Sequence, residues 1–141
     1  MKSKLLTWDN YTSDVKKLTG KIIKSNKKYD FIFGIPRGGL ILAGCLSHKL
    51  NLPILLDVNL LEKLSMDYLT NILVVDDIAD SGKTIMKYAN RFDTATIYRK
   101  FDCSLTPTYY VNINKRWIIF PYECPEVKDT VSKVTGDNPK R

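Results

Sequence analysis

Two adjacent carboxylates stand at the end of an apolar run near the middle of the chain. Residues 72–75 have the length and composition of a buried strand, and Asp76 and Asp77 follow them directly. Burying two like charges side by side is costly unless a cation or hydroxyl groups accompany them. The pair is therefore expected at an exposed strand end, where carboxylates can bind sugar hydroxyls or a divalent cation.

The residues that follow the carboxylates have the composition of an anion site. Residues 79–84 read Ala-Asp-Ser-Gly-Lys-Thr and lead into an expected helix. Free backbone N–H groups, two hydroxyls and the positive end of the helix dipole would gather at such a turn, and a phosphate group fits them. Carboxylates so close to a phosphate cradle suit a sugar phosphate that lies across the strand end.

The end of this segment, Gly82-Lys83-Thr84, also matches the end of the nucleoside-triphosphate P-loop. The first glycine of that motif, G-x-x-x-x-G-K-[ST], falls on Asp77. A carboxylate there would repel the phosphates that the loop must wrap. The sugar phosphate is therefore the preferred ligand.

Strands alternate with helices along the first hundred residues. Strands are expected at residues 29–33, 53–57, 71–76 and 95–98, and helices from about residue 9 or 10, at 40–50 and at 83–92. This alternation predicts an α/β fold, a parallel sheet flanked by helices. Ligands bind such sheets at the carboxyl ends of the strands. Both the glycine-containing turn at residues 34–39 and the segment 76–84 fall at that edge.

The 141 residues are expected to form a single domain. Its core covers about residues 8–100. After Tyr98 the pattern changes to short aromatic pieces broken by prolines, which predicts a small C-terminal hood over about residues 101–125. Residues 126–141 read as a polar tail with little to bury.

Composition favours a cytoplasmic protein that binds something anionic. No apolar stretch approaches the roughly 20 residues of a membrane span, and the N-terminus lacks the pattern of a secretory signal. The three cysteines, Cys45, Cys103 and Cys124, lack the spacing of metal ligands or a disulfide framework. The net charge of +7 suits an anionic partner, although solvated lysines at residues 16–28 also account for much of it.

Residues 76–84 resemble the phosphoribosyl pyrophosphate (PRPP) signature of the type I phosphoribosyltransferases. Residues 34–39 resemble the pyrophosphate loop of the same family, and the similarity extends over roughly residues 8–123. Within the family the chain is most similar to the bacterial and archaeal xanthine-guanine enzymes. Lys100 and Trp117 match two positions of their purine site.

The resemblance implies a role for each matching residue. Asp76 and Asp77 would hold the ribose hydroxyls and Mg²⁺, and Arg37 and Gly38 would bind pyrophosphate. The 5′-phosphate would be held by Ala79, Asp80, Ser81, Gly82, Lys83 and Thr84. At the base, Asp80 would act as acid or base beside N7, Lys100 would bind the 6-oxo oxygen, Trp117 would stack on the ring and Ile118 would add backbone contacts.

The implied activity is transfer of the phosphoribosyl group from PRPP to guanine, xanthine or hypoxanthine in purine salvage. The family is commonly dimeric or tetrameric, so a homodimer or homotetramer with small-molecule substrates is expected, without a membrane or nucleic-acid partner. From the residues alone, Trp117 could equally be core of the hood, and Lys100 a solvated surface charge.

Two alternatives stay open. A non-catalytic protein of the same fold could sense the donor or nucleotides and bind RNA through its basic surface, but the chain shows no interleaving of basic and aromatic residues. A transferase could also use adenine, a pyrimidine or a non-nucleobase amine, although Lys100 argues for a 6-oxopurine. Residues 58–71 are short for a closing loop, so closure is expected to be weaker, or to come from Lys63 and its neighbours or from another subunit.

Overall fold

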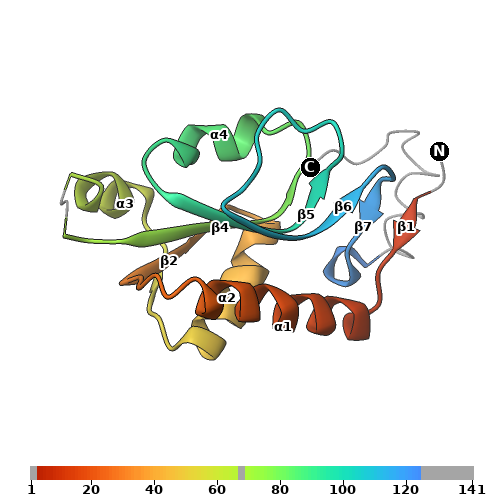
Figure 1. The fold of residues 1–141 in the computed structure, drawn as a ribbon, viewed down its shortest axis with the longest axis horizontal. Helices are drawn as coiled ribbons and strands as arrows, with labels where there is room; N and C mark the ends of the chain where they lie inside the picture. The colour runs from red at the N-terminus through yellow and green to blue at the C-terminus, as the bar shows by residue number, and fades with distance from the viewer. Residues whose placement is uncertain (1–2, 67–68, 125–141) are drawn as a thin grey trace. The chain divides into compact units, whose positions relative to one another are not determined.

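A five-stranded parallel sheet forms the centre of the protein's larger unit, residues Asp14–Lys115 (Figure 1). Its strands are β2 (Phe31–Gly34), β3 (Ile54–Leu55), β4 (Ile72–Ala79), β5 (Asp93–Lys100) and β6 (Tyr109–Asn114), in the spatial order β3-β2-β4-β5-β6. The structure is a computed structural model that describes residues 3–66 and 69–124. A parallel sheet flanked by helices confirms the predicted α/β fold.

Helices cover both faces of this sheet. They are α1 (Trp8–Lys24), α2 (Gly38–Leu50), α3 (Val58–Leu64) and α4 (Lys83–Ala89). Helix α2 packs so closely on β2 that a Cβ on Gly34 would meet the Ala43 side chain at 2.8 Å. Helices α3 and α4 lie on the opposite face, where Leu61 and Tyr88 pack against Phe33 (Figure 1).

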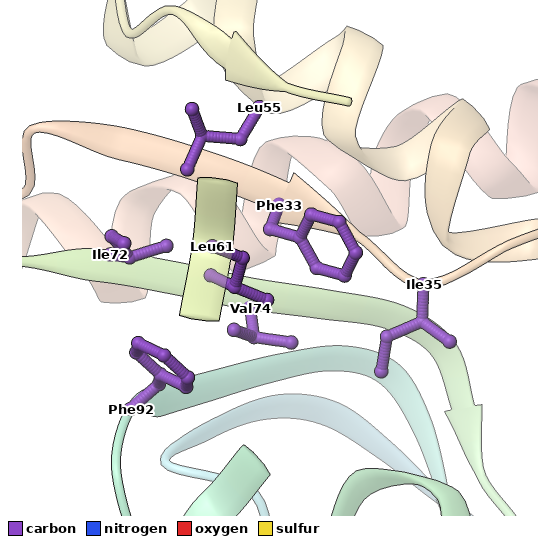
Figure 2. Close-up of a cluster of buried hydrophobic side chains, with 7 residues drawn as sticks. All are labelled: Phe33, Ile35, Leu55, Leu61, Ile72, Val74 and Phe92. Carbon is purple, nitrogen blue, oxygen red and sulfur yellow. The ribbon is translucent and has the colours of Figure 1, made fainter. Parts of the chain in front are cut away.

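A cluster of apolar side chains fills the space between α3 and the sheet (Figure 2). Successive strand residues point to opposite faces, so Ile72 and Val74 join this cluster while Leu73 and Val75 are buried on the α2 side. The cluster consists of Phe33, Ile35, Leu55, Leu61, Ile72, Val74 and Phe92. It fixes which way each residue of β4 faces, including the carboxylates that come later in that strand.

The segment at residues 58–71, which was expected to be short for a closing loop, begins with helix α3. Asp57 caps this helix, because its carboxylate accepts a hydrogen bond from the backbone N–H of Asn59 at 2.8 Å. The helix is only seven residues long, too short for its periodicity to stand out in the sequence. Packing of Leu61 into the core, rather than helix propensity, accounts for it.

The boundary between core and hood needs correction at β6. The sequence assigned residues 109–111 to the hood, whereas β6 pairs in parallel with β5 as the edge strand of the main sheet. This pairing joins Ala95 to Tyr109 and Lys100 to Asn114. Such contacts are distant in sequence, so a short aromatic segment between prolines did not reveal its partner strand.

A smaller unit combines residues from both ends of the described chain, 3–13 and 116–124. Strand β1 (Lys4–Leu5) pairs in parallel with β7 (Ile118–Ile119), and a 3₁₀ turn follows at Pro121–Glu123. Aromatic rings form its interior, with Phe120 stacked on Tyr122 at 5.4 Å between ring centroids. The predicted tail at residues 126–141 lies outside the described residues.

In the part of the chain that the structure describes, no helix has both the length and the apolar character that crossing a bilayer requires.

The apolar cluster of Figure 2 gives a stability test. Leu61→Ala is expected to lower the free energy of unfolding by about 2 to 5 kcal/mol, because it opens a cavity at a fully buried position. Leu56→Ala is the matched control, since the side chain of Leu56 is 78% exposed and its loss should change little. Denaturant titration of both variants measures the difference, and equal values would contradict the burial of α3.

Candidate active site

Strand β4 extends further than its neighbour β2, and the two carboxylates lie on the extension. The last residue pair between these strands is Gly34 with Val75, whereas β4 stays paired with β5 as far as Ala79. Asp76 and Asp77 therefore both lie within the strand, which was expected to end at residue 76 and continues to Ala79. They are nevertheless beyond the end of β2, and both are partly exposed.

The alternation of strand residues separates the two carboxylates. Asp77 has the same parity as Leu73 and Val75, so it lies on the α2 side of the sheet, while Asp76 lies on the side of α3 and α4. The Asp77 carboxylate rests against Gly38, where a Cβ atom would overlap it. The Asp76 carboxylate accepts a hydrogen bond from the backbone N–H of Asp77 at 2.8 Å.

The turn at residues 34–39 packs its backbone directly on β4. The N–H of Ile35 donates to the carbonyl of Val75 at 2.9 Å, and a Cβ on Gly39 would lie 2.5 Å from that same carbonyl oxygen. The peptide bond between Pro36 and Arg37 is cis. Arg37 is exposed immediately before α2, at the edge of the sheet that holds Asp77.

The second turn, at residues 79–84, joins the end of β4 to helix α4. Gly82 has a φ of 87°, in the left-handed region that glycine adopts without strain, and its carbonyl accepts the first helical bond from Met86 N–H at 2.9 Å. The Ser81 hydroxyl accepts from the backbone N–H of Lys83 at 3.2 Å. The turn thus brings polar backbone and hydroxyl groups to the same edge as the carboxylates.

Asp80 and Lys100 come together across the ends of β4 and β5. Their closest N–O distance is 3.7 Å, and the two side chains are 38% and 39% exposed. An ion pair this open to solvent contributes about 1 kcal/mol or less to stability. Both groups can therefore exchange their contact with each other for a contact with a ligand at little cost.

The loop that follows Lys100 was not singled out in the sequence. The Ser104 hydroxyl donates to the backbone carbonyl of Ser81 at 2.9 Å, and the N–H of Cys103 donates to the carbonyl of Lys100 at 3.0 Å. The loop therefore rests on the second turn. Its contacts join residues 23 positions apart, and no spacing in the sequence signals them.

Trp117 and Ile118 belong to the smaller unit. Trp117 is 38% exposed and its carbonyl accepts a bond from the N–H of Lys4 at 2.8 Å, whereas Ile118 is fully buried beside β1. Their predicted contacts with a base stay predictions. Within residues 3–66 and 69–124, no group of three His, Cys, Asp or Glu side chains is assembled in the manner of a metal site.

Solved structures with this arrangement of elements include phosphoribosyltransferases. A purine phosphoribosyltransferase from Pyrococcus horikoshii is 27% identical, with a TM-score of 0.70 over 86% of this chain and 94% of the other. A xanthine-guanine-hypoxanthine phosphoribosyltransferase from Helicobacter pylori is 17% identical, with a TM-score of 0.73 over 93% and 99%. A hypothetical protein from Neisseria gonorrhoeae with bound ppGpp is 22% identical, with a TM-score of 0.72 over 96% of each chain.

The chain therefore has the fold of the type I phosphoribosyltransferases. Its resemblance to that family, and within it to the purine enzymes, is confirmed by these structures. No protein-family model matches the chain.

The contact between Gly38 and Asp77 can be tested with two glycine variants of one helix. Gly38→Ala is expected to displace the Asp77 carboxylate, and so to weaken binding of pyrophosphate with Mg²⁺ at least about tenfold while stability changes by about 1 kcal/mol or less. Gly44→Ala is the control, because a Cβ there meets nothing within 4 Å and alanine favours the helix. Calorimetry that finds equal affinity in both variants would contradict this role of Gly38.

Proposed function

We propose that this protein transfers the phosphoribosyl group from PRPP to a 6-oxopurine and releases pyrophosphate, as in purine salvage. One observation carries the proposal: Asp76 and Asp77 extend beyond β2 between two glycine turns, one beginning at Gly34 and the other containing Gly82. Carboxylates between two anion-binding turns suit a sugar that carries a phosphate at one end and pyrophosphate at the other.

The two ends of the donor would be bound by different turns. Arg37 and Gly38 would bind the pyrophosphate, since Arg37 is exposed and Gly38 is partly exposed at the start of α2. The 5′-phosphate would be bound by the second turn, whose members are Ala79, Asp80, Ser81, Gly82, Lys83 and Thr84. The ribose would lie between the turns, with its hydroxyls on the carboxylates of β4.

Asp76 and Asp77 have the chemistry of a magnesium site that is completed by substrate. Both are carboxylates near an exposed edge, and Mg²⁺ is usually held by one or two carboxylates together with phosphate oxygens and water. Bound there with the donor, the ion would supply positive charge to the pyrophosphate. Asp77 is the nearer of the two to the pyrophosphate turn, because its carboxylate rests against Gly38.

The acceptor base would lie beside Asp80 and Lys100. The Lys100 ammonium would bind the 6-oxo oxygen, and Asp80 would share a proton with N7 of the ring. Trp117 would stack on the ring, and backbone near Ile118 would contact its 2-position. Asp80 and Lys100 are close enough, at 3.7 Å, for one ligand to contact both side chains, which supports a shared ligand.

In the reaction, the bond between C1 of the ribose and the pyrophosphate oxygen breaks, and a bond from C1 to a ring nitrogen of the base forms. The electron pair of the broken bond leaves with pyrophosphate, whose charge Arg37 offsets. Asp80 accepts or supplies the proton at N7 as the charge of the ring changes. Most of the rate enhancement would come from the positioning of donor and base by the two turns and the loop after β5.

A second candidate is nucleotide binding without transfer, and one observation favours it. The similar protein from Neisseria gonorrhoeae was solved with ppGpp, a nucleotide that carries pyrophosphate groups. A chain with the same fold and a basic charge could bind such a ligand at the same turns. A cytoplasmic location and a homodimer or homotetramer remain predictions under either candidate.

One assay separates these candidates. Pyrophosphate release is measured with PRPP, Mg²⁺ and, in turn, guanine, xanthine, hypoxanthine, adenine and orotate. Release with a 6-oxopurine, abolished by chelation of Mg²⁺, is expected. Release only with adenine or orotate would exclude the proposed acceptor, and binding of PRPP or ppGpp without release on any base would favour the second candidate.

The role of Asp80 is tested by removal of its charge alone. Asp80→Asn is expected to lower kcat about 100-fold or more and to leave the affinity for PRPP nearly unchanged, because the amide cannot take up the proton from N7. Asp9→Asn, which changes an exposed carboxylate in the first turn of α1, is the control. A kcat of Asp80→Asn equal to that of the control would refute the assignment.

A further inference from the structure

The loop after β5 contacts the second turn at Gly82, where there is no room for a side chain. A Cβ on Gly82 would lie 2.8 Å from the Ser104 hydroxyl, 3.2 Å from the Cys103 sulfur and 3.2 Å from the backbone N of Leu105. Three consecutive residues of the loop therefore fill the space where the side chain of residue 82 would be. The turn is supported from outside at the residue with the positive φ.

The loop itself is held in place by further hydrogen bonds. The Cys103 N–H donates to the carbonyl of Lys100 at 3.0 Å, and the Phe101 N–H donates to the carbonyl of Asn114 in β6 at 3.0 Å. The Cys103 thiol donates to the carbonyl of Leu105 at 3.0 Å. Because the loop joins strands β5 and β6, the sheet fixes both of its ends. The loop can therefore hold the turn in a defined position relative to the sheet.

We infer that Ser104 is a positioning residue for the 5′-phosphate, an inference that rests on the proposed function. Its hydroxyl donates to the Ser81 carbonyl at 2.9 Å. A carbonyl oxygen that rotated toward a bound phosphate would repel it, whereas the N–H groups of the same turn attract it. By holding that carbonyl, Ser104 keeps the turn in the orientation that suits an anion.

Lys100, the last residue of β5, stands immediately before this loop and pairs with Asp80 at 3.7 Å. The end of β5 and the loop therefore contact the turn at two successive positions, the side chain of Asp80 and the backbone of Ser81. The loop connects the proposed base site with the proposed phosphate site. Ser104 acts through the turn and need not contact the donor.

The test compares two hydroxyl deletions. Ser104→Ala is expected to raise the KM for PRPP about fivefold, the effect of one lost neutral hydrogen bond, and to leave the KM for the base within about twofold. Ser47→Ala removes an equivalent bond, from a hydroxyl near the end of α2 to the carbonyl of Leu52, and should leave both constants unchanged. Ser104→Thr retains a hydroxyl and is expected to restore much of the affinity for PRPP.

Hydrogen exchange of the amides of residues 82–84 gives a readout that does not depend on turnover. These amides should exchange faster in Ser104→Ala than in the wild type or in Ser47→Ala. An unchanged KM for PRPP together with unchanged exchange overturns the inference, while the proposed function stands if the wild type releases pyrophosphate.

The role of Ser104 can also be tested if the proposed function fails. If the wild type releases no pyrophosphate with any base, the proposed function fails, and titration with inorganic phosphate decides the role of Ser104. Weaker phosphate binding by Ser104→Ala than by Ser47→Ala would support the positioning role. Equal binding, or no binding by the wild type, would overturn it.

Discussion

The candidate site depends on close contacts of the backbone at three glycines, where any side chain would collide with a neighbouring segment. Gly39 lets the first turn approach the Val75 carbonyl, and Gly38 leaves room for the Asp77 carboxylate. On the other side of β4, Gly82 leaves room for the loop after β5. Side chains at these positions would separate the turns from β4 and from the loop after β5.

Because β4 is longer than β2, the two carboxylates project beyond the end of β2. Strand β2 ends at Gly34, and β4 continues with β5 for four residues beyond Val75. The extension carries both acidic residues, and the pleat directs them to opposite faces, each toward the side of one turn. Had β4 ended level with β2, at Val75, both carboxylates would lie in a loop, where the pleat would not set their directions.

Much of this could be predicted from the sequence, because the signals are local. The apolar run of β4, the acidic pair and the glycine turns each form a short continuous segment. The order of the elements, and the position of the acidic pair and the turns at the carboxyl edge of the sheet, could therefore be predicted. The position of β6 in the sheet, the short helix α3 and the contact of Ser104 with Ser81 could not be predicted. Each of these depends on partners far away in the chain: β5 for β6, the apolar cluster for Leu61, and the second turn for Ser104.

The smaller unit has a practical consequence for work with this protein. Its strand β7, which directly follows Trp117, is paired with β1 near the start of the chain, and the N–H groups of Lys4 and Leu6 donate to the carbonyls of Trp117 and Ile119. An affinity tag or a trimmed N-terminus would therefore alter the hydrogen bonds of a segment more than a hundred residues downstream. An N-terminal fusion therefore needs a linker that preserves the hydrogen bonds from the Lys4 and Leu6 N–H groups to the carbonyls on either side of Ile118.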